Sequence, residues 1–325
     1  MTNPALYNNC NISACIITDG ADLDKLFKAV RSCFSSCSEI VICANGKLEE
    51  VKFTFRNYSK VKVFPQVWYK DFSKARNEAI EKCKGDWIFI IDSDEELQTP
   101  IKFLNDDYDI YLVQMISELD NDMKAFHYEP RIFKASKNIR YSGKIHEQVN
   151  LENHEFTRCN VQIEQFRIPA SELVTKIKRN AEILESDIDN PNRDYFLCQL
   201  HFELGNSHKA IECGEKVIHS DNYNNQTKAL VSYWMACASQ RFYNSTDVCK
   251  QMLMVSLAFE PLQLIARKKM IEILEEEEAS NEMLIEQYKT LQNINDNKLS
   301  RLPMEVYFSE NFLQNKIENL QWQQQ

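Results

Sequence analysis

The chain has 325 residues, which is long enough for two domains or one large one, and 44% of them are hydrophobic. Its net charge of −10 argues against broad binding to nucleic acid. No apolar run approaches the ~20 residues that a transmembrane segment needs, and residues 1–11 lack the basic start and apolar core of a secretory signal.

Short apolar runs alternate with helical patterns from residue 12 to about residue 165. Helices are predicted over Asp22–Ser35 and Ser73–Cys83, and strands over Ile12–Thr18, Glu39–Cys43, Val61–Phe64, Trp87–Ile91 and Asp109–Ile116. This order predicts an α/β domain over residues 1–168, with a Rossmann-like, mostly parallel sheet flanked by helices. Ligands of such sheets gather at the carboxyl ends of the strands.

Helical patterns take over after Pro169 and continue to about residue 293. Leu204-x-Asn206-Ser207 recurs as Phe242-x-Asn244-Ser245, a spacing of 38 residues (204 to 242) against about 34 for a tetratricopeptide unit. Residues 169–325 are therefore predicted to form an all-α, tetratricopeptide-like domain with a C-terminal tail. Helix pairs of this kind bind peptides or another subunit, so a homodimer through this domain is one expectation. The alternative is a helical cap that only packs on the first domain.

Aromatic residues in the C-terminal tail need burial, either on this chain or on a partner: Tyr307, Phe308, Phe312 and Trp322.

The cysteines number 11, which is odd, and no Cys-x-x-Cys occurs. Most of them lie in apolar stretches, as expected for free thiols used as small buried side chains. This pattern predicts a reducing, cytoplasmic location and disfavours a cysteine zinc site.

Asp92-Ser93-Asp94 directly follows the apolar run Trp87–Ile91. Alternate carboxylates at the end of a buried strand can face one point, and hard divalent cations prefer such oxygen ligands. The alternative is an acidic cap on a helix that begins near Leu97. Upstream, Arg76 offers a rigid fork of donors that suits a diphosphate, or it forms a salt bridge that caps its own helix.

The segments Asp71–Asn77 and Gly85–Glu96 resemble those of family 2 glycosyltransferases, which have Asp-Phe-Ser-x-Ala-Arg-Asn and Gly-Asp-Trp…Asp-x-Asp-Glu in this order. The resemblance implies a GT-A type fold and a hexosyl- or N-acetylhexosaminyl-transferase that uses a nucleotide-sugar donor, expected to be a UDP-sugar. It implies a metal ion, Mn²⁺ or Mg²⁺, held by Asp92 and Asp94, with His146 either joining these metal ligands or holding a phosphate. The donor-binding residues that it implies are Thr18, Asp19, Asn45, Asp71, Arg76, Asn77, Asp92, Ser93 and Arg131.

A third cluster, Glu129–Phe133 followed by Tyr141–Glu147, resembles the Arg-x-Phe…Gly-x-x-His-Glu segment of a subset of the same family. An inverting transfer needs a base for the proton of the acceptor. Glu147 is the candidate, with Asp94 as a second catalytic carboxylate and Glu95 and Glu96 as competitors. The alternative is a surface His-Glu pair in a loop.

One position departs from the family pattern. Members usually carry an aspartate after the second strand that holds the uracil ring or the ribose, whereas this chain has Ala44 there. Asn45 is expected to hydrogen-bond the base instead, or Asp19 compensates. Otherwise, donor specificity has changed or donor binding is weak.

The sequence thus predicts an inverting, metal-dependent glycosyltransferase that acts on a peptide, protein or glycan acceptor. The principal alternative is a catalytically impaired transferase-like scaffold that binds a partner through its helical repeats, which Ala44 favours. A nucleotidyltransferase would need a glycine-rich phosphate loop, and the chain has only 6 glycines. A hydrolase with paired carboxylates does not account for Asp71–Asn77.

Overall fold

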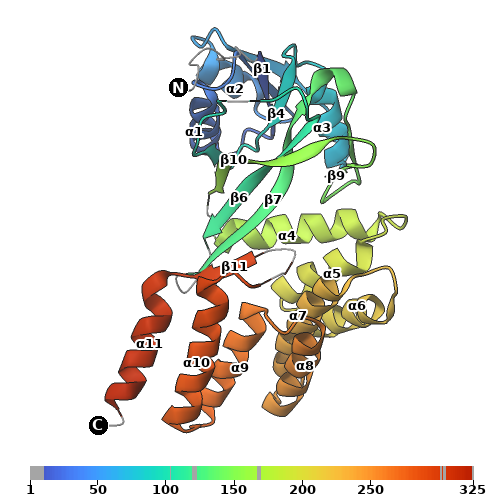
Figure 1. Cartoon of the computed structure of the whole chain (residues 1–325). Coiled ribbons are helices and arrows are strands. Elements are labelled where there is room, and N and C mark those ends of the chain that lie inside the picture. Colours follow the sequence, from blue (N-terminus) through green and yellow to red (C-terminus); the bar gives the residue numbers. More distant parts are fainter. Residues whose placement is uncertain are drawn as a thin grey trace, which may run out of the picture. The chain divides into compact units, whose positions relative to one another are not determined.

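The fold is described from a computed structural model that covers residues 11–102, 104–118, 123–166, 170–300, 302 and 305–323. The chain divides into two compact units (Figure 1). The first consists of Met1–Ser117 and His127–Arg167, and the second of Glu118–Phe126 and Ile168–Gln325. The predicted domain boundary between residues 168 and 169 stays a prediction.

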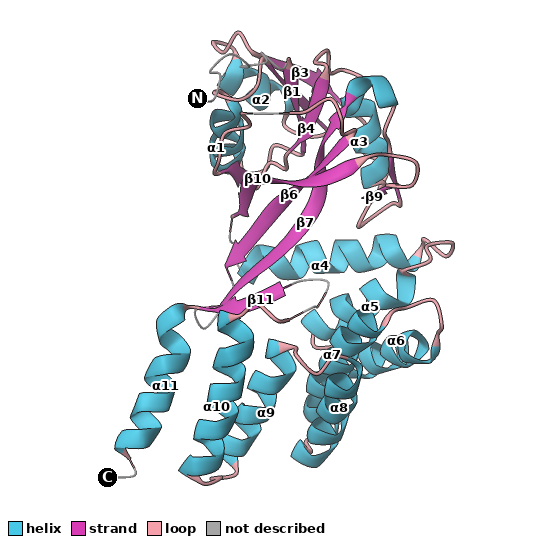
Figure 2. Cartoon of the chain, viewed as in Figure 1, coloured by secondary structure: helices cyan, strands magenta, loops and turns pink. Residues whose placement is uncertain are grey.

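The first unit is built on a mixed sheet in the strand order β3-β2-β1-β4-β7-β6-β10-β5 (Figure 2). Its strands are β1 Ile12–Thr18, β2 Glu39–Ala44, β3 Val61–Pro65, β4 Trp87–Ile90, β5 Glu95–Leu97, β6 Ile110–Glu118, β7 Met123–Lys134 and β10 Phe156–Gln165. The four strands β3-β2-β1-β4 are parallel, β7 runs antiparallel to β4, and β10 runs parallel to β6 but antiparallel to β5. The predicted α/β class is confirmed, with its parallel strands at one end of the sheet.

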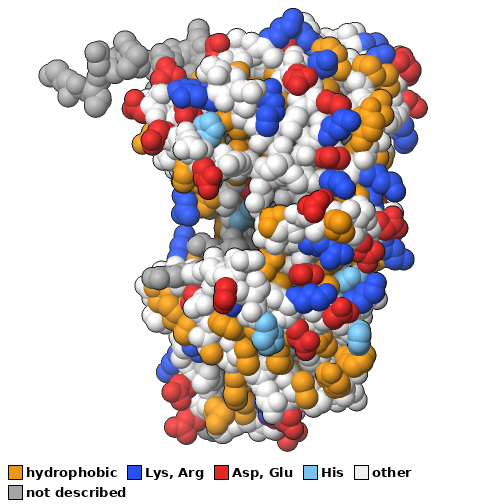
Figure 3. All heavy atoms as spheres, turned by 90° about the vertical axis from the view of Figure 1, so that its right-hand side faces the viewer, with side chains coloured by type: hydrophobic (Ala, Val, Ile, Leu, Met, Phe, Trp, Pro, Cys, Tyr) orange, Lys and Arg blue, Asp and Glu red, His pale blue; other side chains and the backbone are white. Residues whose placement is uncertain are grey.

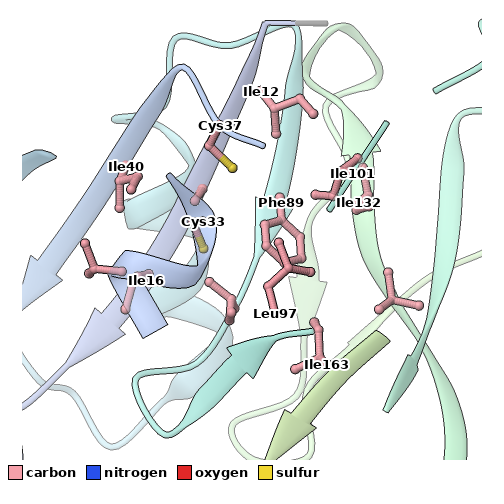
Figure 4. Close-up of a cluster of buried hydrophobic side chains, with 14 of the residues drawn as sticks. Ile12, Ile16, Cys33, Cys37, Ile40, Phe89, Leu97, Ile101, Ile132 and Ile163 are labelled. Atoms are coloured by element: carbon pink, nitrogen blue, oxygen red, sulfur yellow. The ribbon is translucent and has the colours of Figure 1, made fainter. Parts of the chain in front are cut away.

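Helices cover both faces of the parallel strands. They are α1 Leu23–Cys33, α2 Leu48–Phe55 and α3 Phe72–Ile80. Phe89 of β4 belongs to the apolar cluster that includes α1 and α2 side chains (Figure 4), whereas Ile88 and Ile90 belong to the cluster that includes α3 side chains. Because successive side chains of a strand point to opposite faces, the continuous apolar run of β4 fits a strand buried on both sides.

The helix expected near Leu97 does not form, so that prediction is wrong. Leu97 ends the short strand β5, which pairs with β10 through Leu97 and Ile163. Both side chains are buried in the same cluster. The partner strand lies more than sixty residues away along the chain, so local sequence gives no sign of this pairing. Helix α2 and the strands β7 and β10 were also missed by the predictions.

The second unit is helical apart from Met123–Phe126 of β7 and strand β11 Glu305–Phe308, which pair with each other. Its helices are α4 Ala170–Glu185, α5 Arg193–Glu203, α6 Ser207–His219, α7 Asn225–Tyr243, α8 Thr246–Phe259, α9 Leu264–Glu276, α10 Asn281–Asp296 and α11 Glu310–Trp322. Each helix from α4 to α10 contacts the next one, and α10 also contacts α11 although β11 lies between them in the chain. The predicted all-α second half is confirmed. None of the helices in the described residues is long and apolar enough to cross a membrane.

The repeated Asn-Ser motif occupies equivalent places in two helix pairs. Asn206 precedes α6 and Ser245 precedes α8, and the Ser245 hydroxyl accepts a hydrogen bond from the Val248 backbone N–H. Both motifs therefore mark the start of the second helix of a pair. The assignment of these pairs as tetratricopeptide repeats stays a prediction.

Two of the tail aromatics are buried within the second unit. Tyr307 and Phe308 lie in an apolar cluster with side chains of α10 and α11, and Phe312 packs against it. Trp322 is 79% exposed at the end of α11. The ten cysteines in the described residues are free thiols, as expected, and most are buried.

Candidate active site

Helix α3 begins with a side-chain cap that positions the rest of the segment Asp71–Asn77. Asp71 Oδ1 accepts hydrogen bonds from the Lys74 backbone N–H at 2.9 Å and from the Ser73 hydroxyl at 2.8 Å. Such a cap satisfies one of the donors that a helix N-terminus leaves unpaired. The Phe72 N–H also donates to the carbonyl of Lys144. The first turn of α3 is thereby tied to the loop that carries Glu147.

Arg76 lies one turn further on and is only 8% exposed. Its guanidinium donates two hydrogen bonds to Asp92, at 2.6 and 3.0 Å, and its Nε donates to Glu147 at 2.5 Å. Arg76 thus links α3, the end of β4 and the loop after β8 (Tyr141–Ser142). The expected capping bridge within α3 is not its role, because its carboxylate partners come from elsewhere in the chain.

Arg131 forms a second buried arginine centre beside the first. It lies on β7, is 6% exposed, and contacts Glu95 at 2.9 Å, Glu129 at 2.8 Å and Asp92 at 3.6 Å. The Asp92 backbone N–H donates to Glu95 at 2.8 Å. Asp92 therefore lies between both guanidinium groups at the carboxyl end of β4.

Two arginines face four carboxylates in this cluster, so it carries two excess negative charges when every acid is ionised. Burial raises the pKa of Glu95 to about 8, aided by the charge of Asp92 and opposed by Arg131. Burial also acts on Glu129, but Arg131 and His127 outweigh it and lower its pKa to about 2. Neighbouring carboxyl groups in one cluster thus have pKa values pushed apart, which is typical of functional sites.

A second polar group gathers at the ends of β1 and β2. The Asn45 N–H donates to the Thr18 carbonyl at 2.9 Å, and a Cβ on Gly46 would lie 2.6 Å from the Asp19 carbonyl oxygen. Glycine is therefore required at position 46 for the two loops to approach this closely. The predicted donor residues Thr18, Asp19 and Asn45 are brought together here.

Three other residues predicted to bind the sugar donor lie in different surroundings. The Asn77 amide donates to the Tyr141 carbonyl and accepts from the Tyr141 N–H, both at 2.9 Å, so it fixes α3 to β8. Asp71 serves as the helix cap, and Ser93 lies partly exposed in the turn between β4 and β5. Donor contacts for these three residues stay predictions.

Glu147 lies in the loop between β8 and β9 (Gln148–Val149), and its side chain is 10% exposed. The alternative of a surface His-Glu pair does not describe it, because Glu147 is bonded to the buried Arg76. The preceding His146 has a left-handed backbone, with φ of 50°. This conformation is unusual for a residue with a side chain and is a frequent mark of functional loops.

The predicted metal ligands do not form a preassembled cage. Among the described residues, no group of three or more His, Cys, Asp or Glu side chains is placed to hold a metal ion. Asp92 is bonded to Arg76, whereas Asp94 is partly exposed in the following turn. Such a set fits Mg²⁺ or Mn²⁺ that arrives with phosphates, because these ions are commonly held by one or two carboxylates together with substrate oxygens and water.

Sequence reasoning missed His127 and Gln66. His127 Nε2 lies 2.9 Å from Glu129, and His127, Glu129 and Arg131 occupy alternate positions of β7. Recognising β7 as a strand would have placed the three on one face. Gln66 directly follows β3, at the edge where ligands of parallel sheets gather.

The fold and the site together define a GT-A type domain with a charged cluster at its strand ends. Residues 15–156, a little less than half of the chain, match the family described as Glycosyl transferase family 2. The curated relatives include the SPbeta prophage-derived glycosyltransferase SunS of Bacillus subtilis, 22% identical over 249 residues that cover 68% of this chain and 58% of SunS. The chain thus spans little more than half the length of SunS.

Two further similarities extend this comparison. A TPR repeat-containing protein of Synechococcus elongatus is 27% identical over 145 residues, which cover 43% of this chain and 35% of that protein. Among solved structures, S. aureus TarS 1–349 in complex with UDP-GlcNAc is 12% identical with a TM-score of 0.42, and the match covers 74% of this chain and 92% of TarS 1–349.

Proposed function

We propose that this protein is an inverting, metal-dependent glycosyltransferase that moves a sugar from a UDP-sugar to a peptide, protein or glycan acceptor. The observation that carries the proposal is the contact of Arg76 with both Asp92 and Glu147 at the end of β4. The guanidinium group of Arg76, which suits a phosphate ligand, thus contacts both the Asp-x-Asp turn and the candidate general base.

The charge of the cluster supports a divalent cation. Even with Glu95 protonated, the other three carboxylates of the cluster outnumber the two guanidinium groups, so the site repels a diphosphate unless a cation accompanies it. Asp94, together with Asp92 and His146 as predicted, would hold the ion. When bound, the ion would neutralise charge on the leaving nucleoside diphosphate. The two guanidinium groups are suited to hold the phosphate oxygens by paired hydrogen bonds.

Glu147 is proposed as the base that takes the proton of the acceptor. Its Oε1 accepts the hydrogen bond of Arg76 Nε, which fixes the carboxylate and leaves the other oxygen for the acceptor hydroxyl or amide. Fixing a catalytic group in this way supplies the orientation that proton transfer requires.

The helical unit is proposed to recognise the acceptor or a second copy of the chain. Several apolar side chains of α7 and α8 are half exposed or more, including Phe242 (50%), Tyr243 (57%) and Met254 (61%). Figure 3 shows hydrophobic side chains gathered over the helical unit on the face that it draws. Exposed apolar patches of this kind mark interaction surfaces.

The test is calorimetric titration of the full chain with UDP, UDP-glucose and UDP-GlcNAc, each with Mn²⁺, with Mg²⁺ and with chelator. We expect binding only with a cation, and we expect Asp94→Asn to weaken it strongly while the fold is kept. The matched control is Asp221→Asn, which changes an exposed acid of the helical unit. A folded wild-type chain that binds none of these nucleotides would contradict the proposal.

The full chain is needed for this test. β11 of the second unit pairs with Met123–Phe126 of β7, and Phe126 and Tyr307 are in ring contact. A chain cut before Pro169 would leave this part of β7 without its partner strand. Loss of function in such a fragment would therefore not separate donor binding from acceptor binding.

A further inference from the structure

Gln66 carries a buried hydrogen-bond acceptor that the fold does not use. Its backbone N–H donates to the Ala44 carbonyl at 2.9 Å, and its side-chain Nε2 donates to the Ala75 carbonyl at 2.8 Å. Its Oε1 is buried and accepts no hydrogen bond from the described part of the chain. Buried polar atoms of folded proteins are nearly always paired, so an unpaired acceptor indicates a missing partner.

The orientation of this amide is fixed by its neighbours. The Ala75 carbonyl can only accept, so the group that faces it must be the NH₂. The opposite atom is therefore the carbonyl oxygen. Oε1 therefore lacks a hydrogen-bond donor, and an N–H group of a ligand with the right geometry would supply one.

The position of Gln66 relates it to the donor site. It follows β3 beside the end of β2, where Ala44 pairs with Pro65, and Asn45 comes next after Ala44. Its amide contacts the carbonyl of Ala75, the residue directly before Arg76. A single ligand that meets Arg76 with its phosphates can therefore extend along α3 towards Gln66.

The chemistry of this edge suits a nucleobase more than a sugar. The side chain of Ala44 is a methyl group, so it cannot accept a hydrogen bond from a base. A hydrogen-bond acceptor at this edge of the sheet must come from another residue. Tyr69, 53% exposed, lies in the loop after Gln66 and stacks under the Lys74 ammonium. An aromatic ring can hold a base by its face, and an amide carbonyl can hold it by its edge.

We propose that Gln66 selects the base of the donor by accepting the ring N–H of uracil at its Oε1. The inference rests on the proposed function, since it assigns a role within the nucleoside diphosphate site. Uracil presents N3–H to such an acceptor. Cytosine presents an unprotonated N3 in the same place, so two acceptors would face each other, and CDP is disfavoured.

The ligand-side test uses the wild-type full chain and removes the N–H from the ligand. We expect UDP with Mn²⁺ to bind at least about tenfold more tightly than 3-methyl-UDP or CDP. This comparison needs no substitution, so it holds whether or not a Gln66 variant folds.

The protein-side test is Gln66→Met, which keeps the length of the side chain without its amide. We expect the affinity for UDP to fall by about tenfold, whereas the affinity for CDP should stay within about threefold of the wild-type value. The matched control is Gln162→Met on β10, which removes another partly buried amide of the first unit and should leave both affinities unchanged.

The outcomes separate the two proposals. Equal affinity of the wild type for UDP and 3-methyl-UDP overturns the role of Gln66, because an internal water then satisfies Oε1, while the proposed function stands. An unchanged ratio of UDP to CDP affinity in a folded Gln66→Met protein overturns it likewise. Failure of the wild type to bind any nucleoside diphosphate overturns both.

Discussion

The two units differ in what they bury. The first unit buries ionisable side chains together in one place, including Arg76, Glu95 and Arg131, each no more than 8% exposed. The second unit buries mostly small polar groups that serve local contacts, such as Ser256, whose hydroxyl donates to the Ala229 carbonyl and accepts from Gln263. Moving charges out of water is unfavourable even when they are paired, whereas small polar groups are readily satisfied.

This difference suggests a separate role for each unit. Stability alone would be served as well by apolar side chains in place of the arginine cluster. The cluster is therefore expected to matter for ligands and turnover, and the helical packing for folding. The predictions below test that division, and each pairs a change with a matched control or a contrasting variant.

The largest effect is expected from Glu147→Gln. Glutamine keeps the hydrogen bond to Arg76 Nε but cannot accept a proton at neutral pH. We expect UDP-sugar binding to be retained and turnover to fall by about 10²–10⁴. Glu277→Gln, which neutralises an ion-paired acid on the helical unit, should leave turnover unchanged. Near-normal turnover of Glu147→Gln would pass the role of base to Asp94, Glu95 or Glu96.

A stability effect with no change in donor binding is expected from Leu253→Ala. Leu253 is fully buried in the α7–α9 part of the second unit, with Cys249 and Ile273 in the same cluster. The cavity should lower the free energy of unfolding by about 2–5 kcal/mol, measured by urea unfolding. The neighbouring Met254, 61% exposed, provides the control, since Met254→Ala should change stability by less than about 0.5 kcal/mol. A matching loss of UDP affinity in Leu253→Ala would break the division of labour.

The sequence predicted more of the first unit than of its site. Apolar runs predicted β1, β2 and β4, whereas β3 carries Lys62 between Val61 and Val63 and was predicted from a shorter apolar pattern. The Asp-x-Asp turn follows β4 as expected. The partners of Arg76 could not be predicted, because Glu147 lies 71 positions away and reaches it through a loop whose geometry depends on Asn77 and Tyr141. Patterns of local sequence report burial, whereas the pairing of charges depends on long-range packing.

A smaller effect, confined to binding, is expected from Arg76→Lys. Lysine keeps the charge but cannot bond Asp92 twice and Glu147 at the same time. We expect the affinity for UDP-sugar to fall by at least about tenfold, measured by calorimetry. Arg241→Lys makes the same change on the helical unit, where Arg241 stacks on Phe202, and should leave affinity unaltered. Equal affinities of Arg76→Lys and wild type would make Arg76 a structural residue.

The last prediction uses Glu95→Gln and concerns the dependence of stability on pH, not activity. The pKa of Glu95 is raised by burial from an ordinary 4.5 to about 8, so between these values the folded chain holds a proton that the unfolded chain releases. This contribution to stability is fully present below pH 4.5 and is lost as pH rises through about 8. Glutamine resembles the protonated form and does not titrate. Urea unfolding at pH 5, 6.5 and 8 should therefore show a flatter dependence of stability on pH in Glu95→Gln than in wild type.

Glu129→Gln supplies the opposite case within the same cluster. The pKa of Glu129 is lowered to about 2, because Arg131 and His127 outweigh its burial, so its contribution is present above pH 4.5 and is lost as pH falls towards 2. Glu129→Gln should therefore leave the slope between pH 5 and 8 as in wild type and change it only on the acid side. If both variants changed the same pH range, the excess negative charge would be shared across the cluster, and Glu95 would not be the group that holds the proton.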